Sequence, residues 1–198
     1  MRTFAPLGGL LAFGLLLAPV SVQAQSADAC WLRGATPAQA AERPSPLGVV
    51  AIPMGEAEAT LCYNRPSAKG RTVMGDLVPF GQAWRTGANE ATAIHLPFAA
   101  TIGGVEVEPG SYSIYTVPGE TEWEITISRS FERWGIPISA EVQEAAVGTF
   151  TRPAALSDEM VEMMTFTWEA HGEMMGHVVL EWENTRVEFP IHMAGMNH

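Results

Sequence analysis

The chain has 198 residues and a formal net charge of −11, with 22 acidic and 11 basic side chains. An acidic protein without an extended basic run has no surface that would hold nucleic acid or anionic lipid, so we expect neither as a partner. Apolar residues make up 47% of the chain and charged residues 17%. This composition can fill a core, and the length predicts one compact domain.

The first 24 residues have the pattern of an export signal. Arg2 is the only charged residue before Asp28, and an apolar run from Leu7 to Val20 follows it. Val22-Gln23-Ala24 then places small residues where a signal peptidase requires them. The run is short and interrupted by proline, which disfavours a membrane span. We therefore expect cleavage near Ala24 and a mature protein in the periplasm or outside the cell.

Residues 25–46 are rich in alanine, proline and glutamine and lack a sustained period, so we expect an N-terminal arm or a short helical cap. The chain has two cysteines, Cys30 in this arm and Cys62 beyond it. In an exported protein an even number of cysteines favours a disulfide, which would stabilise the fold by roughly 3 to 4 kcal/mol. Two free thiols are the alternative.

From residue 47 to residue 191, glycine, proline or asparagine regularly interrupts short runs of β-branched and aromatic residues. This rhythm predicts an all-β domain, an antiparallel β-sandwich of about eight to ten strands. The clearest signal follows an expected strand at 92–101, where Gly103-Gly104 suits a two-residue hairpin turn with positive φ at both positions. Strands at 111–117 and 121–128 follow. Ser139 is the expected cap of a helical turn, and a strand at 145–151 should end at Pro153.

Three further strands are predicted at 164–169, 178–183 and 187–191, because apolar and polar residues alternate in each segment. Glu183-Asn184-Thr185 is the expected tight turn between the last two strands. Residues 192–198 then form a tail that is rich in methionine and histidine.

Several segments of this region are similar to those of a known family. They are residues 63–71, 75, 77–81, 101–104, 109–113, 180–186 and the string Trp84-Arg85-Thr86-Gly87-Ala88-Asn89-Glu90-Ala91-Thr92. On these segments, residues 47–191 resemble domain-of-unknown-function family 2911, a group of exported bacterial proteins. The resemblance implies an exported β-rich domain and carries over no catalytic residue. Residues 171–177 and the tail after Ile191 depart from the family pattern.

A group of cationic side chains lies within 21 residues, namely Arg65, Lys69, Arg71 and Arg85. One interpretation is a binding module for a small anionic ligand or glycan, with Asn89 and Glu90 as further binding residues. Guanidinium groups hold carboxylate, sulfate or phosphate through two hydrogen bonds at once. The other interpretation is internal ion pairing with Asp76, Glu90 and the acidic second half of the chain.

A second group of candidate ligands is soft. It consists of His171, Met174, Met175, His177, His192, Met193, Met196 and His198. Thioether and imidazole together suit copper, whereas zinc prefers thiolate or more imidazole, so copper is the expected metal if one binds. Pairing of 165–170 with 177–183, and of 177–183 with the last strand, would bring the loop and the tail to one end of the sheet. A solvated loop and tail without metal is the alternative.

The sequence contains no nucleophile elbow, zinc-protease helix or phosphate-binding glycine loop, so we assign no catalytic residue. A binding protein is therefore favoured over an enzyme, with copper as the leading ligand and a small anionic ligand or glycan as the alternative. A hydrolase that uses Glu90 beside Arg85 is the remaining alternative, because a carboxylate next to an arginine can have a shifted pKa.

Overall fold

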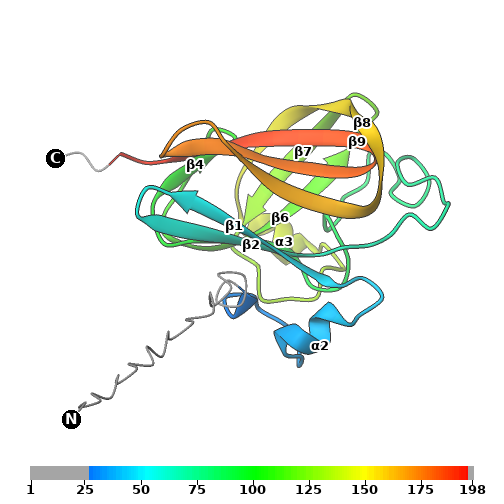
Figure 1. The fold of residues 1–198 in the computed structure, drawn as a ribbon, viewed down its shortest axis with the longest axis horizontal. Helices are drawn as coiled ribbons and strands as arrows, with labels where there is room; N and C mark the ends of the chain where they lie inside the picture. The colour runs from blue at the N-terminus through cyan, green and yellow to red at the C-terminus, as the bar shows by residue number, and fades with distance from the viewer. Residues whose placement is uncertain (1–26, 196–198) are drawn as a thin grey trace, which may run out of the picture.

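The computed structural model describes residues 27–195, which fold into antiparallel strands with two short helices, α2 and α3 (Figure 1). The strands are β1 (Leu47–Met54), β2 (Ala57–Asn64), β3 (Thr92–Leu96), β4 (Ala100–Ile102), β5 (Val105–Val107), β6 (Gly110–Pro118), β7 (Glu122–Ser128), β8 (Ala146–Ala170) and β9 (Met175–Met193). The helices are α2 (Pro37–Ala41) and α3 (Ala140–Glu144). The predicted all-β class is confirmed.

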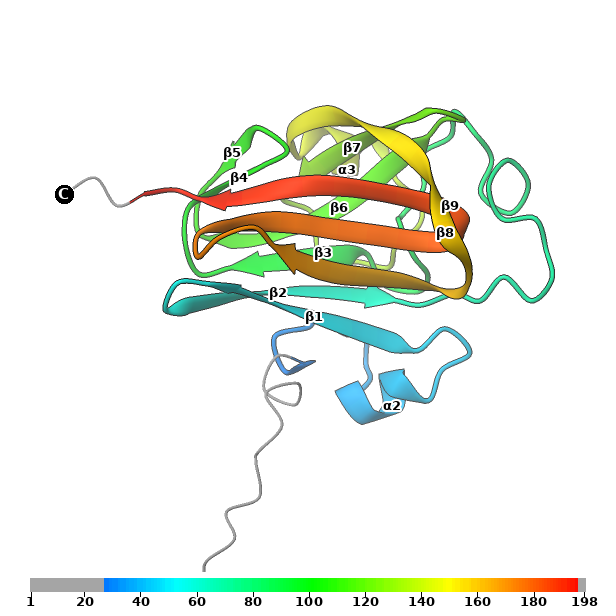
Figure 2. The ribbon, with the colours of Figure 1, turned by 45° about the horizontal axis from the view of Figure 1, so that its top comes forward.

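The strands form two layers that are joined through β8. Their order is β1-β2-β3-β6-β7-β8-β9-β4-β5. Residues 146–153 of β8 pair with β7, and residues 154–170 pair with β9. Figure 2 shows β9 and the end of β8 lying over β2, β3 and β6. One long strand therefore turns the corner between the layers of a sandwich, as strands that switch sheets do.

Strand β9 reverses direction within its length. The backbone N–H of Met193 donates to the carbonyl of Met174 at 2.9 Å, yet a straight strand of 19 residues would separate its ends by about 60 Å. Glu183 has a φ of 55° at the reversal, and Figure 2 shows the two halves side by side. The structure confirms the tight turn predicted at 183–185.

Other expected elements are confirmed with shifted boundaries. Gly103 and Gly104 have φ values of 60° and 95° and join β4 to β5. Ser139 occupies the N-cap position of α3, but its side chain forms no capping hydrogen bond. The strand expected at 92–101 is divided, because β3 pairs with β2 and β6 whereas β4 pairs with β9 in the other layer. The strand expected to end at Pro153 continues through it, and the last strand ends at Met193 rather than Ile191.

The core lies between the layers. Trp123, Ile125 and Ile127 of β7 face Leu180 and Trp182 of β9, and each is at most 2% exposed. Burying one such side chain stabilises the fold by about 1.5–3 kcal/mol. The alternation in the sequence therefore identified the inward faces of these strands.

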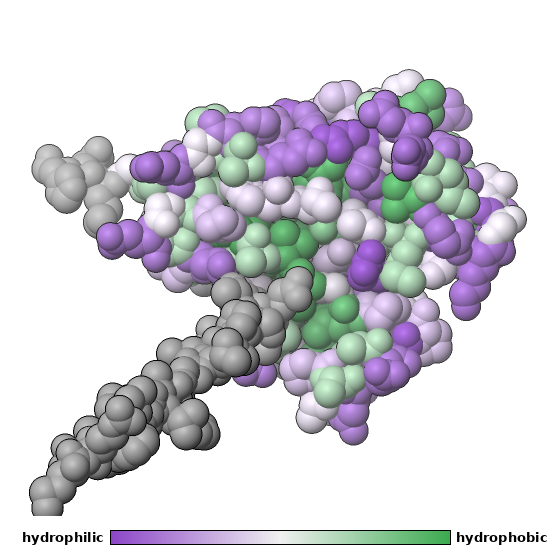
Figure 3. Space-filling model, in the orientation of Figure 1, coloured by the Kyte–Doolittle hydropathy of each residue, from purple (hydrophilic) through white to green (hydrophobic). Residues whose placement is uncertain are grey.

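The N-terminal arm is attached to the outer side of the β1–β2 pair. A disulfide joins Cys30 to Cys62, as predicted. On the face drawn in Figure 3, hydrophobic residues gather between α2 and the neighbouring strands. The expected export signal, Met196 and His198 lie outside the described residues. Within 27–195 no helix is long and apolar enough to cross a membrane.

Candidate functional site

The segment between β2 and β3, residues 65–91, covers the end of the sandwich where β9 reverses. Backbone N–H groups of Val73 and Met74 donate to the Glu183 carboxylate at 3.1 and 3.4 Å. Trp84 exchanges backbone hydrogen bonds with Thr116 of β6 at 2.7 and 2.9 Å. The segment is thus fixed to both layers, and it carries the predicted cationic group.

A pocket of about 360 Å³ opens between this segment and the strand ends. It is lined by Ser45, Pro66, Arg71, Leu77, Val78, Ala83, Trp84, Arg85, Gly87, Ala88, Ile136 and Trp182. A volume of this size is within the range of small-molecule sites. The pocket therefore brings together two of the four predicted cationic side chains and a pair of tryptophans.

Backbone carbonyl groups position the Arg71 guanidinium. Its Nε–H donates to the Ala68 carbonyl at 2.8 Å, and Nη2 donates to the Ser67 carbonyl at 2.7 Å. No carboxylate among residues 27–195 forms an ion pair with it. Arg71 therefore keeps its charge available at the pocket.

Arg85 is half-buried and held by a strained turn. Its Nε–H donates to the Gly87 carbonyl at 3.2 Å. The intervening residue, Thr86, has a φ of 56°, which is unusual for a β-branched residue, and Thr92 Oγ1 donates to its carbonyl at 2.7 Å. Burial lowers the pKa of the Arg85 guanidinium. Within the described part of the chain no carboxylate neutralises this partly desolvated cation.

Tryptophan rings form one wall of the pocket. The rings of Trp84 and Trp182 stack with centroids 5.9 Å apart and an interplanar angle of 21°. Trp182 is anchored by an indole N–H that donates to the Glu162 carbonyl at 3.2 Å. Leu77 and Ile136, which are 40% and 55% exposed, add apolar surface at the rim. The pocket therefore combines cationic groups with an aromatic and apolar wall.

The other two cationic residues of the predicted group contact β8 instead. Arg65 donates from Nε to the Met164 carbonyl at 3.2 Å and from Nη2 to Thr165 Oγ1 at 2.9 Å. The backbone N–H of Lys69 donates to Glu162 Oε1 at 2.8 Å, while the residue is exposed. Neither residue lines the pocket.

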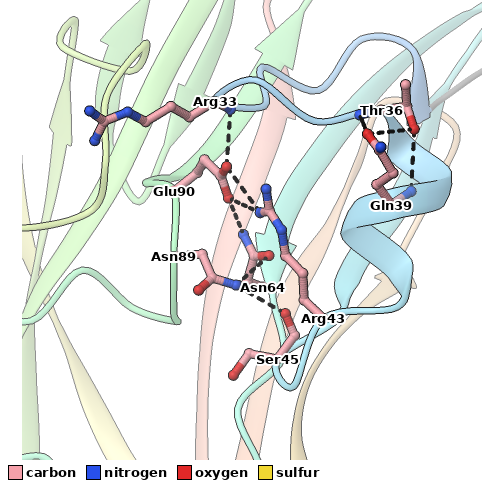
Figure 4. A network of polar contacts seen from close by, with 8 residues as sticks. All are labelled: Arg33, Thr36, Gln39, Arg43, Ser45, Asn64, Asn89 and Glu90. Atoms are coloured by element: carbon pink, nitrogen blue, oxygen red, sulfur yellow. Dashed lines mark hydrogen bonds and ion pairs between the residues drawn. The ribbon is translucent and has the colours of Figure 1, made fainter.

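Asn89 and Glu90 belong to a network that attaches the arm to the domain (Figure 4). The Glu90 carboxylate, 2% exposed, pairs with Arg43 at 2.7 Å and accepts from the Arg33 backbone N–H at 3.0 Å. Asn64 Nδ2 donates to Glu90 Oε2 at 3.3 Å, and Asn89 Nδ2 donates to Asn64 Oδ1 at 3.1 Å. The carboxylate is thus occupied by Arg43 rather than Arg85, and it does not line the pocket.

The soft residues gather at the opposite end of the layer formed by β9, β4, β5 and the second part of β8, which we call the upper layer. The rings of His171 and His177 have centroids 4.6 Å apart, and the Met193–Met174 backbone bond brings the end of β9 beside the β8–β9 turn. Met193 packs against the core. Within residues 27–195 no three His, Cys, Asp or Glu side chains are placed to share a metal ion.

The comparison with protein families decides the family. The model for a protein of unknown function, DUF2911, matches residues 45–191. The chain belongs to this family. The DUF2911 match spans β1 to β9 almost completely and ends next to His192. No curated protein and no solved structure matches the chain.

The segments that carry the DUF2911 resemblance also build the pocket, because residues 63–71, 77–81, 84–92 and 180–186 all contribute lining residues. Sequence reasoning identified Arg71 and Arg85 but missed Trp84, Trp182 and Ile136. Trp84 directly precedes Arg85, so its position was a usable signal. The inward position of Trp182 was predicted by strand alternation, but its stacking on Trp84 depends on where the β2–β3 segment crosses the sandwich end.

Proposed function

We propose that this DUF2911 protein binds a small anionic molecule with a ring-shaped or apolar body in the pocket of Arg71 and Arg85. The observation that carries the proposal is that both guanidinium groups line one pocket without a carboxylate partner among the described residues. A partly buried cation is stabilised by a counter-charge. A carboxylate or sulfate group of a ligand would supply it, with short charge-assisted hydrogen bonds.

The tryptophan wall supports a ligand with a flat face. The partly buried Trp84 ring lies next to the cations and stacks on the buried Trp182 ring behind it, and aromatic rings bind apolar or ring-shaped bodies. An acidic sugar or an aromatic carboxylate would satisfy both halves of the pocket. Another depression, of about 460 Å³ beside the β1–β2 turn, is lined by Glu56 and Glu173. The negative charge of these two carboxylates disfavours binding of an anionic ligand there.

The lining favours binding over hydrolysis. None of the described residues that line the pocket has a carboxylate, imidazole or thiol side chain. The Glu90 carboxylate lies in the network that attaches the arm. General acid–base catalysis needs such a group within hydrogen-bond reach of the reacting atoms. We infer a ligand-binding protein that acts where its predicted export signal would deliver it, in the periplasm or outside the cell.

Quenching of tryptophan fluorescence tests the proposal, with benzoate, galacturonate and inorganic sulfate as probes. We expect the two ring-bearing carboxylates to saturate the protein and to bind more tightly than sulfate. Arg85→Met and Arg71→Met should each weaken carboxylate binding at least about tenfold, since truncating a charged hydrogen-bonding partner costs roughly 2 to 5 kcal/mol.

Lys69→Met is the matched control, because it removes a nearby cation that does not line the pocket. It should leave the affinity within about twofold of the unmodified protein. Equal losses in all three variants would indicate a nonspecific charge effect. Absence of saturation by any probe, or unchanged affinity in both arginine variants, would disprove the proposal.

A further inference from the structure

We propose that the end of the upper layer opposite the pocket is a Cu(I) site, formed by the side chains of His171, Met175 and His192. This inference is independent of the anion pocket. Trp182 at the pocket and Met175 lie at opposite ends of the same half of β9, about 20 Å apart along the strand.

The strand register places donors from three neighbouring segments in one row. The His171 backbone N–H donates to the Met175 carbonyl at 3.0 Å, so residue 171 lies across from residue 175. The Met193–Met174 hydrogen bond of 2.9 Å sets the register of the two halves of β9 and places His192 across from Met175. Side chains directly opposite each other have Cβ atoms about 4.5–5.5 Å apart, a distance that one metal ion can bridge.

These side chains all point to the outer face of the layer. Gly176 and Val178 are buried, whereas Met175 is exposed and His177 is partly exposed, so these two side chains face outward at the end of the strand. The outward strip ends at Val179, which is fully buried. Ile191 is fully buried, which turns its neighbour His192 outward. His192 is exposed and Met175 is 38% exposed. The donors are therefore accessible to an ion from solvent.

The two nearest imidazoles are already close together. His171 and His177 have ring centroids 4.6 Å apart, and His177 Nδ1 lies 3.4 Å from Glu188 Oε1. The carboxylate fixes the His177 ring, and His177 in turn packs on the His171 imidazole and helps to orient this ligand, as residues around a metal ligand do. Glu188 is itself held by Arg186 at 2.9 Å.

The donor set selects the metal. The row supplies two imidazoles, and no third His, Cys, Asp or Glu side chain among residues 27–195 is placed to share an ion with them, so a thioether is needed to complete the coordination. Thioether with imidazole suits Cu(I), whereas zinc takes imidazole, thiolate or carboxylate and calcium takes oxygen. Met193 is excluded because it packs on the core, and the Met174 sulfur lies toward Gly55 at the β1–β2 turn.

The experiment is anaerobic competition for Cu(I) between the purified full chain and bicinchoninate. Met175→Leu and His192→Gln should each weaken Cu(I) affinity at least about tenfold, and Cu K-edge X-ray absorption should lose its sulfur scatterer in Met175→Leu. Met160→Leu is the matched control, because Met160 is an exposed methionine at the bend of β8 away from this end. It should keep the affinity within about twofold.

Removal of residues 196–198 distinguishes the sheet site from a tail site. The truncated chain should keep its affinity, since the proposed ligands all precede Ala194. Affinity weaker than micromolar in the full chain, equal affinity in Met175→Leu and Met160→Leu, or loss of binding on truncation alone would each overturn the proposal. Arg85→Met, which alters only the distant pocket, should leave Cu(I) binding unchanged.

Discussion

The four clustered cations differ in what each guanidinium or ammonium group contacts. Arg65 is bound by oxygen atoms of β8, and Lys69 is exposed. Arg71 and Arg85 are positioned by carbonyl groups of their own segment and line the pocket. Main-chain carbonyls orient a guanidinium without neutralising its charge, so these two residues remain able to bind an anion.

His95 gives the fold a dependence on pH. Its Nδ1 lies 2.7 Å from Ser111 Oγ, its Nε2 is buried without a partner in the described part of the chain, and burial lowers its pKa. The unfolded chain takes up a proton as the pH falls below about 6.5, whereas the folded chain resists protonation until a lower pH. Stability should therefore decrease as the pH falls through this window.

Thermal melting between about pH 7.5 and pH 5 checks this prediction. The melting temperature of the unmodified protein should fall further over this range than that of His95→Gln, because the glutamine side chain does not titrate there. Because Glu58 lines the same depression as His95, the comparison should be repeated in a Glu58→Gln background. Identical slopes for the two proteins would contradict the prediction.

Among the elements, the β4–β5 hairpin depends on two glycines with different surroundings. Both have positive φ, but an added Cβ at Gly103 would lie 2.3 Å from the Phe150 ring, whereas at Gly104 nothing lies within 4 Å. Gly104→Ala should cost about 1 kcal/mol of unfolding free energy, from backbone strain. Gly103→Ala should cost a further 1–3 kcal/mol or so, because the aromatic ring must move.

Urea unfolding of both variants measures this difference. Gly104→Ala is the internal control, because it makes the same substitution in the same turn and measures the cost of placing alanine at positive φ without a contact to Phe150. A Gly103→Ala variant as stable as Gly104→Ala would show that Phe150 is free to move away at no cost.

Across the whole molecule, the arm is attached to the sandwich by two separate links. One is the Cys30–Cys62 disulfide, which spans 32 residues, and the other is the Glu90–Arg43 network. Closing a loop of this length stabilises by roughly 3 to 4 kcal/mol. The double variant Cys30→Ser, Cys62→Ser should therefore melt about 6 to 16 °C lower while keeping its β-rich circular dichroism.

Thiol titration of the denatured, unreduced protein is the companion measurement. It should detect no free thiol, since the described chain has no unpaired cysteine. Two titratable thiols would show that the bridge is absent in solution. An unchanged melting temperature in the double variant would show that the Glu90 network holds the arm without it.

The sequence alone determined the features that depend on neighbouring residues. Alternation marked the inward faces of β7 and β9, Gly103-Gly104 marked a hairpin because few other residues adopt positive φ there, and the cysteine count indicated the bridge. The long family segments determined the DUF2911 membership. Each of these signals depends on neighbouring residues in the sequence, so it can be interpreted without knowing how the strands pack.

Only the tertiary structure decided which candidates share a site. The segment from residue 65 to residue 91 contains no regular strand or helix that would set a side-chain period, so its sequence did not separate Arg71 and Arg85 from Arg65 and Lys69. Glu90, three residues after Gly87, faces the arm because Arg43 reaches it from a segment 47 residues earlier. Trp182 joins the pocket because β9 reverses beside Trp84. Such contacts between distant segments arise from the packing of the two layers, which local patterns do not encode.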